Sequence, residues 1–262
     1  MEEGLHIVLA SERLFNLWGL PITSSLLTAW LVIAVLLIAT WLIRRNLSLI
    51  PGKIQAGVEM FFEYVLTMIE QNLGTRALAL RYFPLIMTIF IFVFTANMFD
   101  FLPIYGTIGI VDHEHHGLIP LFHAVNADLN STLALAIISF LTIELSGILT
   151  LGVLKYGSKF VNFTGGLVGF LVGLVELIGN LARLVSLSFR LFGAIFAGHV
   201  LLLVVGMFVP YILPVPIMLF EMFIGLLQAA VFAILTMAFI KLAIEEPHGA
   251  DHGPVHTHAA SH

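Results

Sequence analysis

The sequence contains no cysteine in 262 residues and has few charged residues. Without thiols, the chain can form neither a disulfide framework nor a thiolate metal site. Charged residues make up 10% of the sequence, and the net charge of -5 is spread without a basic block, which argues against nucleic-acid binding. Hydrophobic residues make up 60%. A soluble domain of this length could not cover so much apolar surface, so the composition predicts a helical membrane protein.

The features of a cleaved signal peptide are also missing at the start of the chain. Glu2 and Glu3 stand where a basic start would be needed, and no cleavage site follows. We therefore expect residues 1–25 to be an N-terminal segment that is kept ahead of the first membrane span.

Three apolar runs are each long enough to cross a bilayer once, at residues 26–43, 82–102 and 129–154. Arg44 and Arg45 close the first run, whereas the second run ends close to Asp100. Because basic residues favour the cytoplasmic side, we expect the first run to end inside and the second to end outside.

Residues 53–71 have a different pattern from these runs. Glu59, Glu63 and Glu70 are interleaved with apolar residues at helical spacing. Such a helix buries one apolar face and keeps its charges in water, which predicts an interfacial amphipathic helix on the inner surface.

Residues 166–208 form a stretch too long for one upright span. At about 1.5 Å per residue, a helix of this length measures roughly 60 Å, against a hydrocarbon core of about 30 Å. No proline or glycine interrupts residues 180–192, so no turn is predicted there. We expect one long, steeply tilted helix, then a proline-rich turn and a second long helix at 217–244 that runs antiparallel to the first.

The predicted fold is an all-α membrane protein with about five membrane helices and one interfacial helix, in a single polytopic domain over residues 1–262. Residues 247–262 are rich in histidine, glycine and alanine and are predicted to be a flexible tail. The loop residues His113, Glu114, His115 and His116 lack the spacing that places two imidazoles on one helical face. No metal and no cofactor is therefore expected.

Charged residues recur inside the long predicted helix. Glu176, Arg183 and Arg190 are spaced by seven residues, or two helical turns, so they share one face. An arginine at the centre of a bilayer costs at least about 2.5 to 3.5 kcal/mol on insertion scales, and such residues are usually functional. The remaining positions of this face are small or polar, namely Gly179, Asn180, Ser186, Gly193 and Ala197. Small residues let another helix approach closely, so we expect this face to contact protein.

Polar residues of the two last helices are also predicted to lie in pairs at the same depth in the membrane. On two antiparallel helices, the residue numbers of two positions at equal depth add up to a nearly constant sum. The pairs are Arg190 with Gln228, His199 with Glu221, and Glu176 with Lys241. Histidine and carboxylate groups can exchange protons near neutral pH, whereas a guanidinium stays charged. The pattern predicts two proton paths kept apart by the fixed cation of Arg190.

The segment from Arg183 to Gly193, Arg-Leu-Val-Ser-Leu-Ser-Phe-Arg-Leu-Phe-Gly, closely resembles the signature of subunit a of F-type ATP synthases. Phe-Asp-Phe-Leu-Pro at residues 99–103 and Ala-Asp-Leu-Asn at residues 127–130 are also similar to segments of that family. Leu184 and Ala194 depart from the family, which commonly has proline and asparagine at these positions. Neither departure removes a titratable group.

The resemblance implies a proton-translocating stator subunit, a non-catalytic component that couples ion flow to rotation and ATP synthesis through two offset half-channels. Arg190 is the essential residue that it implies, with His199 and Glu221 as the pair of the outer half-channel and Gln228 near the arginine. The implied partners are the c-ring against the Arg190 face, the b subunits of the peripheral stalk and the lipid bilayer. The implied location is an energy-coupling membrane, taken here as the bacterial plasma membrane, with the C-terminus in the cytoplasm.

Structural roles stay open for several of these polar residues. Arg190 could join helices through an internal ion pair, and Arg183 could snorkel or pair with Glu176. Glu144 has no obvious local partner in the third span, and it either lines the inner half-path or is a protonated carboxyl in the bundle. Helix capping would explain the secondary candidates at the outer mouth, Asn97, Asp100, Asp128 and Asn130. The alternative function is a secondary ion-coupled transporter, which should show internal repeats.

Overall fold

The computed structural model describes residues 13–17, 20–48, 50–102, 109–111, 118–153, 156–157, 166–209 and 212–245. Its six long helices in this part of the chain are α1 (Ser24–Arg45), α2 (Lys53–Leu73), α3 (Arg76–Phe99), α4 (Leu129–Leu151), α6 (Gly166–Phe208) and α7 (Pro214–Ile244). All except α2 are long and apolar enough to cross a membrane. The prediction of an all-α membrane protein with five spans and one further helix is confirmed.

Several helix bounds differ from the predicted spans, for local reasons. α3 starts at Arg76 instead of residue 82, because Thr75 caps the helix by accepting a hydrogen bond from the Leu78 N–H (3.4 Å). α4 ends at Leu151, where Gly152 has a φ of 84°, a conformation that glycine adopts without steric cost. α7 starts at Pro214, since the first helical turn tolerates a proline.

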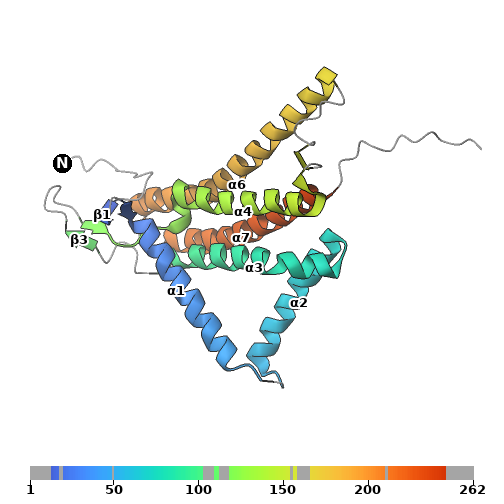
Figure 1. The fold of residues 1–262 in the computed structure, drawn as a ribbon. Coiled ribbons are helices and arrows are strands. Elements are labelled where there is room, and N and C mark those ends of the chain that lie inside the picture. Colours follow the sequence, from blue (N-terminus) through green and yellow to red (C-terminus); the bar gives the residue numbers. More distant parts are fainter. Residues whose placement is uncertain are drawn as a thin grey trace, which may run out of the picture.

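Two short strand pairs were not predicted from the sequence. β1 (Arg13–Leu17) pairs antiparallel with β2 (Leu20–Thr23), and β3 (Gly109–Val111) pairs antiparallel with β4 (Leu118–Pro120). Both hairpins lie at the end of the molecule where α1 begins (Figure 1). The fold is still that of an all-α membrane protein, and the two strand pairs lie at the predicted outer end of the helical bundle.

The helical bundle consists of α3, α4, α7 and the C-terminal half of α6, which lie side by side (Figure 1). One buried cluster joins α2, α3 and α7 and includes Ile69, Ile86 and Met237. A second cluster joins α3, α4, α6 and α7 and includes Leu191 and Phe232, both fully buried. These clusters fix the rotation of α6 and α7 about their axes, and with it the faces that carry the polar residues.

Three segments leave this bundle. α1 packs through Val32 against α3 and the short 3-10 helix η1 (Val125–Ala127), then diverges, and α2 returns toward the bundle at an angle (Figure 1). α6 runs antiparallel to α7, and its N-terminal half extends away from the other helices (Figure 1). Large apolar side chains are exposed along that half, among them Leu171, Val175 and Ile178. Such surfaces are expected of a chain surrounded by lipid and partner subunits.

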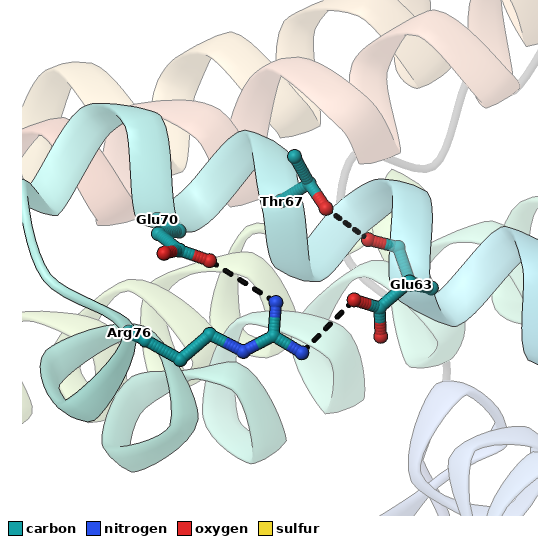
Figure 2. Close-up of polar contacts among 4 residues, drawn as sticks. All are labelled: Glu63, Thr67, Glu70 and Arg76. Carbon is teal, nitrogen blue, oxygen red and sulfur yellow. Dashed lines mark hydrogen bonds and ion pairs between the residues drawn. The ribbon is translucent and has the colours of Figure 1, made fainter.

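The junction between α2 and α3 is held by a single arginine. Figure 2 shows that Arg76 donates to Glu63 (Nη2···Oε1 2.9 Å) and to Glu70 (Nη1···Oε2 3.1 Å). Thr67 donates in turn to the main-chain oxygen of Glu63 (2.8 Å). Glu63 and Glu70, two of the acidic residues that predict an interfacial helix, therefore also link α2 to the start of α3, beside the buried cluster that packs the two helices together.

Candidate functional site

The face of α6 that carries Arg190 is not covered by the rest of the described chain. Arg190, Ser186 and Ala197 are exposed. A Cβ placed on Gly179 or Gly193 would meet nothing within 4 Å, so open space lies beside these glycines. Arg190 forms no ion pair with any carboxylate in the described ranges. The part of the predicted small face around Arg190 therefore points away from the bundle with an unneutralised cation on it. Asn180, which was predicted to lie on the same face, is 6% exposed and donates to Glu144 on α4.

The opposite face of α6 is buried in the bundle. Leu187, Leu191 and Ile195 belong to the cluster shared with α3, α4 and α7, and Ser188 lies within 3.3 Å of Thr132 on α4, hydroxyl to hydroxyl. This packing decides which side of α6 is exposed. An internal ion pair of Arg190, the structural alternative, is not formed within the described residues.

His199 and Glu221 are brought together by the α6–α7 pairing. The Nδ1 atom of His199 lies 3.5 Å from the Oε1 atom of Glu221 and 3.0 Å from the main-chain oxygen of Ile195. Glu221 is only 3% exposed, and neither oxygen of its carboxyl group has a hydrogen-bond partner among the described residues. A buried carboxyl without a donor is costly as an anion, which suits a group that binds and releases protons.

Gly198 makes this pairing possible and was not identified from the sequence. A Cβ on Gly198 would collide with the Glu221 carboxyl group. The missing side chain lets α7 bring this carboxyl against the backbone of α6, beside His199. A glycine directly before the histidine was the available signal, but its meaning depends on how the two helices face each other.

Gln228 and Asn97 lie in the core next to this pair. Gln228 is buried on α7, and no hydrogen bond joins it to Arg190, the residue that it matches in depth. Asn97 is 1% exposed, donates to the main-chain oxygen of Gly225 (2.8 Å) and accepts from the side chain of Asn126 (2.7 Å). Asn97 therefore fastens α3 and η1 to α7 between Glu221 and Gln228.

Asp128 and Asn130 form the predicted cap of α4. Asp128 accepts hydrogen bonds from the main chain (2.9 Å) and side chain (3.2 Å) of Asn130 through Oδ1. Its Oδ2 atom accepts from the Ser25 hydroxyl on α1 (2.6 Å), a contact across 103 residues that was not predicted. Asp100 is the C-cap residue of α3. The capping role of Asp128 is thus present, and it also ties α1 to the bundle.

His123 is a further titratable residue at this end that was not identified from the sequence. Its main-chain N–H donates to the Thr28 hydroxyl of α1 (3.2 Å). Burial lowers the pKa of His123, the nearby His199 lowers it further, and Asp128 acts in the opposite direction. Since the lowered pKa keeps this imidazole neutral at pH 7, His123 belongs electrostatically to the cluster of His199 and Asp128.

Glu144 has two partners, which corrects the expectation that it lacks one. Its Oε2 atom accepts from the Tyr156 hydroxyl (2.8 Å), and its Oε1 atom accepts from the Asn180 side chain (3.1 Å). Neither partner was predicted, because Tyr156 follows α4 and Asn180 belongs to α6. Glu144 is therefore fixed between two segments of the chain.

Arg183 does not form the ion pair with Glu176 that was one of its expected roles. Its guanidinium carbon lies 5.5 Å from the ring centroid of Phe239 on α7, a cation–π distance. Lys241, which matches Glu176 in depth, pairs instead with Glu245 (3.8 Å) one turn further along the chain. The third predicted pair is therefore not in contact.

Some predicted features lie outside the described residues. These are the histidine-containing loop at residues 113–116 and the tail at residues 247–262, as well as the N-terminal residues 1–12. Within the described ranges, no group of three or more histidine and acidic side chains could hold a metal ion.

Comparison with known proteins gives one consistent result. A family model described as ATP synthase A chain matches residues 26–241. A protein named ATP synthase subunit a from Campylobacter jejuni is 37% identical over 222 residues, covering 83% of this chain and 89% of the relative. Proteins of the same name are 32% identical over 228 residues in Moorella thermoacetica, covering 87% and 94%, and 30% identical over 222 residues in Geotalea daltonii, covering 84% and 86%.

Proposed function

Since the chain belongs to the ATP synthase subunit a family, we propose that it passes protons between two offset half-channels and a rotating ring of c subunits, with Arg190 keeping the half-channels apart. It is the proton-translocating stator subunit of the rotary ATP synthase. A secondary ion-coupled transporter, the alternative left open by the sequence, does not fit membership of this family.

The single observation that carries the proposal is the exposed, unpaired position of Arg190 on the small face of α6. A cation at this depth is expensive unless a counter-charge faces it, and no described residue of the chain supplies one. The small residues around it leave room for a neighbouring helix. A carboxylate on each passing c subunit would supply the missing charge.

Arg190 separates two groups of titratable residues along α6. The outer group consists of His199 and Glu221, with His123 and Asp128 near them. The inner group contains Glu144 and Glu176, with Arg183 beside them. At about 1.5 Å per residue, Arg190 lies roughly 14 Å from the level of His199 and roughly 21 Å from that of Glu176. The guanidinium cannot pass a proton on, so each group serves its own side.

Rotation follows from the fixed charge. A carboxylic acid of the ring that comes opposite Arg190 is driven to ionise and gives its proton to the inner group. After it moves past, it is protonated again from the outer group and can enter the lipid as a neutral acid. Each proton that crosses 100 mV contributes about 2.3 kcal/mol, so several crossings supply the energy for one ATP.

The remaining partners and the location are part of the same proposal. The b subunits of the peripheral stalk would contact surfaces away from the Arg190 face, such as the exposed apolar side of α1, which includes Trp30 and Trp41. The membrane would be the bacterial plasma membrane. Arg44, Arg45 and Lys241 at the ends of α1 and α7 would place those ends, and the C-terminus, in the cytoplasm.

The natural absence of cysteine allows a direct test by cross-linking. Ser186 is exposed on the Arg190 face, whereas Ser188 is buried against α4. We expect Ser186→Cys to form disulfides with cysteines placed on the outward-facing surface of the c subunits in native membranes. Ser188→Cys, the same substitution two residues away, should form none. Cross-linking of neither variant, or of Ser188→Cys alone, would contradict the proposed contact with the ring.

A second test uses the glycine beside Glu221. Gly198→Ala places a methyl group where the Glu221 carboxyl group lies, so it should push this carboxyl away from His199 and lower proton-driven ATP synthesis by about tenfold, as misplacement of a reacting group does. Gly206→Ala is the matched control, because a Cβ there meets nothing within 4 Å. The measurement is the rate of proton-driven ATP synthesis in inverted membrane vesicles that contain either variant. Equal rates in the two variants would show that the close approach at Gly198 is unimportant.

A further inference from the structure

On the inner side of Arg190, the carboxylate of Glu144 is held at both oxygens by neutral donors. The Tyr156 hydroxyl donates to Oε2 (2.8 Å), and the Asn180 amide donates to Oε1 (3.1 Å). The donors come from different segments, since Asn180 belongs to α6 and Tyr156 lies beyond the end of α4. The carboxylate is therefore fixed in position and in orientation.

The position of the Tyr156 ring depends on a glycine. Tyr156 is 5% exposed, and a Cβ on Gly147 would collide with its ring. Because Gly147 lacks a side chain, the ring can lie against α4 with its hydroxyl directed at Glu144. Burial raises the pKa of Tyr156, and the hydrogen bond to Glu144 raises it further. The phenol therefore keeps its proton at working pH and is a fixed donor that does not carry protons.

The surroundings of Glu144 are suited to a proton path. Glu144 and Asn180 line a narrow cleft between α4, α6 and α7 with a volume of about 10 Å³, room for about one water molecule, and Arg183 and Phe239 also line it. Among the residues that the structure describes, Glu176 and Arg183 of α6 act electrostatically on Tyr156 in addition to Glu144. From α7, the cleft receives only the uncharged ring of Phe239 among its lining residues.

We propose that Tyr156 is a positioning residue for proton release, holding Glu144 as an oriented carboxylate in the inner half-channel. The inference rests on the proposed function. A proton leaves the carboxylic acid of the ring, binds an oxygen of Glu144 and passes to water on the inner side, while the phenol keeps its own proton. Hydrogen bonds donated to a carboxylate favour it over the carboxylic acid. Tyr156 and Asn180 thus fix the orientation of the Glu144 oxygens that take up and pass on each proton.

The test is Tyr156→Phe in the whole ATP synthase, reconstituted in liposomes, with ATP synthesis measured against pH on the side of the catalytic head at constant driving force. Loss of the hydroxyl removes one of the two donors that fix the Glu144 carboxylate, so the acidic limb of the activity profile should move by about one pH unit. Tyr82→Phe is the matched control. Tyr82 is also 5% exposed, and its hydroxyl has no hydrogen-bond partner among the described residues, so its profile should stay that of the unmodified protein.

Two further variants separate positioning from stability. Asn180→Leu removes the second donor from α6 and should shift the profile in the same direction. In a Glu144→Gln background, Tyr156→Phe should cause no additional shift, because no carboxylate is left to hold. An unchanged profile in both Tyr156→Phe and Asn180→Leu, or the same shift with and without Glu144, would overturn the inference.

The failure of this inference can be told apart from failure of the proposed function. If only the role of Tyr156 is wrong, Tyr156→Phe keeps the original profile while Arg190→Ala stops ATP synthesis. If the proposed function is wrong, Arg190→Ala continues to make ATP. Co-purification of the c subunits with each variant shows that the complex has assembled.

Discussion

Replacement of Arg190 by alanine is expected to abolish proton-driven ATP synthesis. Arg190 is exposed on the small face of α6 and has no carboxylate partner within the described chain, so its charge acts on the ring. Without the charge, a ring acid opposite residue 190 has no reason to ionise, and rotation loses its direction. ATP synthesis in inverted vesicles should fall at least about 1,000-fold, the scale of losing a centrally placed charge in a low-dielectric site.

The alanine variant should also leak protons. Arg190 is the barrier between the outer group around Glu221 and the inner group around Glu144, because it cannot take up or release a proton. When the barrier is lost, protons can pass from one group to the other on the ring without turning it. We expect an imposed pH gradient to decay faster in vesicles that contain Arg190→Ala. A gradient as long-lived as in the unmodified membranes would argue against two separated half-channels.

Arg190→Lys should fail as well, although it keeps a positive charge. Lysine is a compact ammonium whose pKa shifts readily on burial, whereas the guanidinium stays charged and presents a planar fork to a carboxylate. Arg45→Ala is the control for loss of an arginine in general, since Arg45 lies at the exposed end of α1 over the Trp41 ring (5.5 Å). Normal growth on a respiratory substrate with either Arg190 variant would refute the assigned role.

The exposed face of α6 could be predicted because its signal lies within one helix. Seven-residue spacing places Arg190 on one side of the helix with Arg183 and Glu176, although the structure exposes Arg190 and lays Arg183 against Phe239 on α7. The depth match of His199 with Glu221 was accessible for a related reason, since two antiparallel helices joined by a short turn leave little choice of register. Their contact at 3.5 Å agrees with this reasoning. The role of these residues in proton transfer stays a prediction.

Contacts between distant segments could not be predicted in this way. The sequence shows no partner for Glu144 because its donors, Tyr156 and Asn180, are 12 and 36 residues away in the chain and depend on how α4 and α6 face each other. Ser25 and Asp128 meet across 103 residues for the same reason. The need for a glycine at position 198 can be recognised only when the position of the Glu221 carboxyl group is known. Rotation of a helix about its axis is decided by the packed core and not by the polar residues themselves.

Exchange of His199 and Glu221 should be tolerated far better than either substitution alone. His199→Glu places two carboxyl groups in contact, and Glu221→His places two imidazoles there, so each single variant loses the opposite charge that stabilises an ion of the pair. The double variant restores one acid and one base at the same site. Both side chains meet between α6 and α7 at 3.5 Å, next to the space that Gly198 leaves open.

The expected sizes follow from coupling between residues in contact. We expect each single variant to lower ATP-driven proton pumping and proton-driven ATP synthesis by about 100-fold, and the double variant to lose only about tenfold. Independent losses would multiply to about 10,000-fold, so the expected coupling is a factor of about 1,000, or about 4 kcal/mol. Equal amounts of co-purified c subunits in the three variants control for assembly. A double variant whose loss is the product of the two single losses would show that His199 and Glu221 act independently, and the outer half-channel would then need a proton route through residues such as His123 and Asp128.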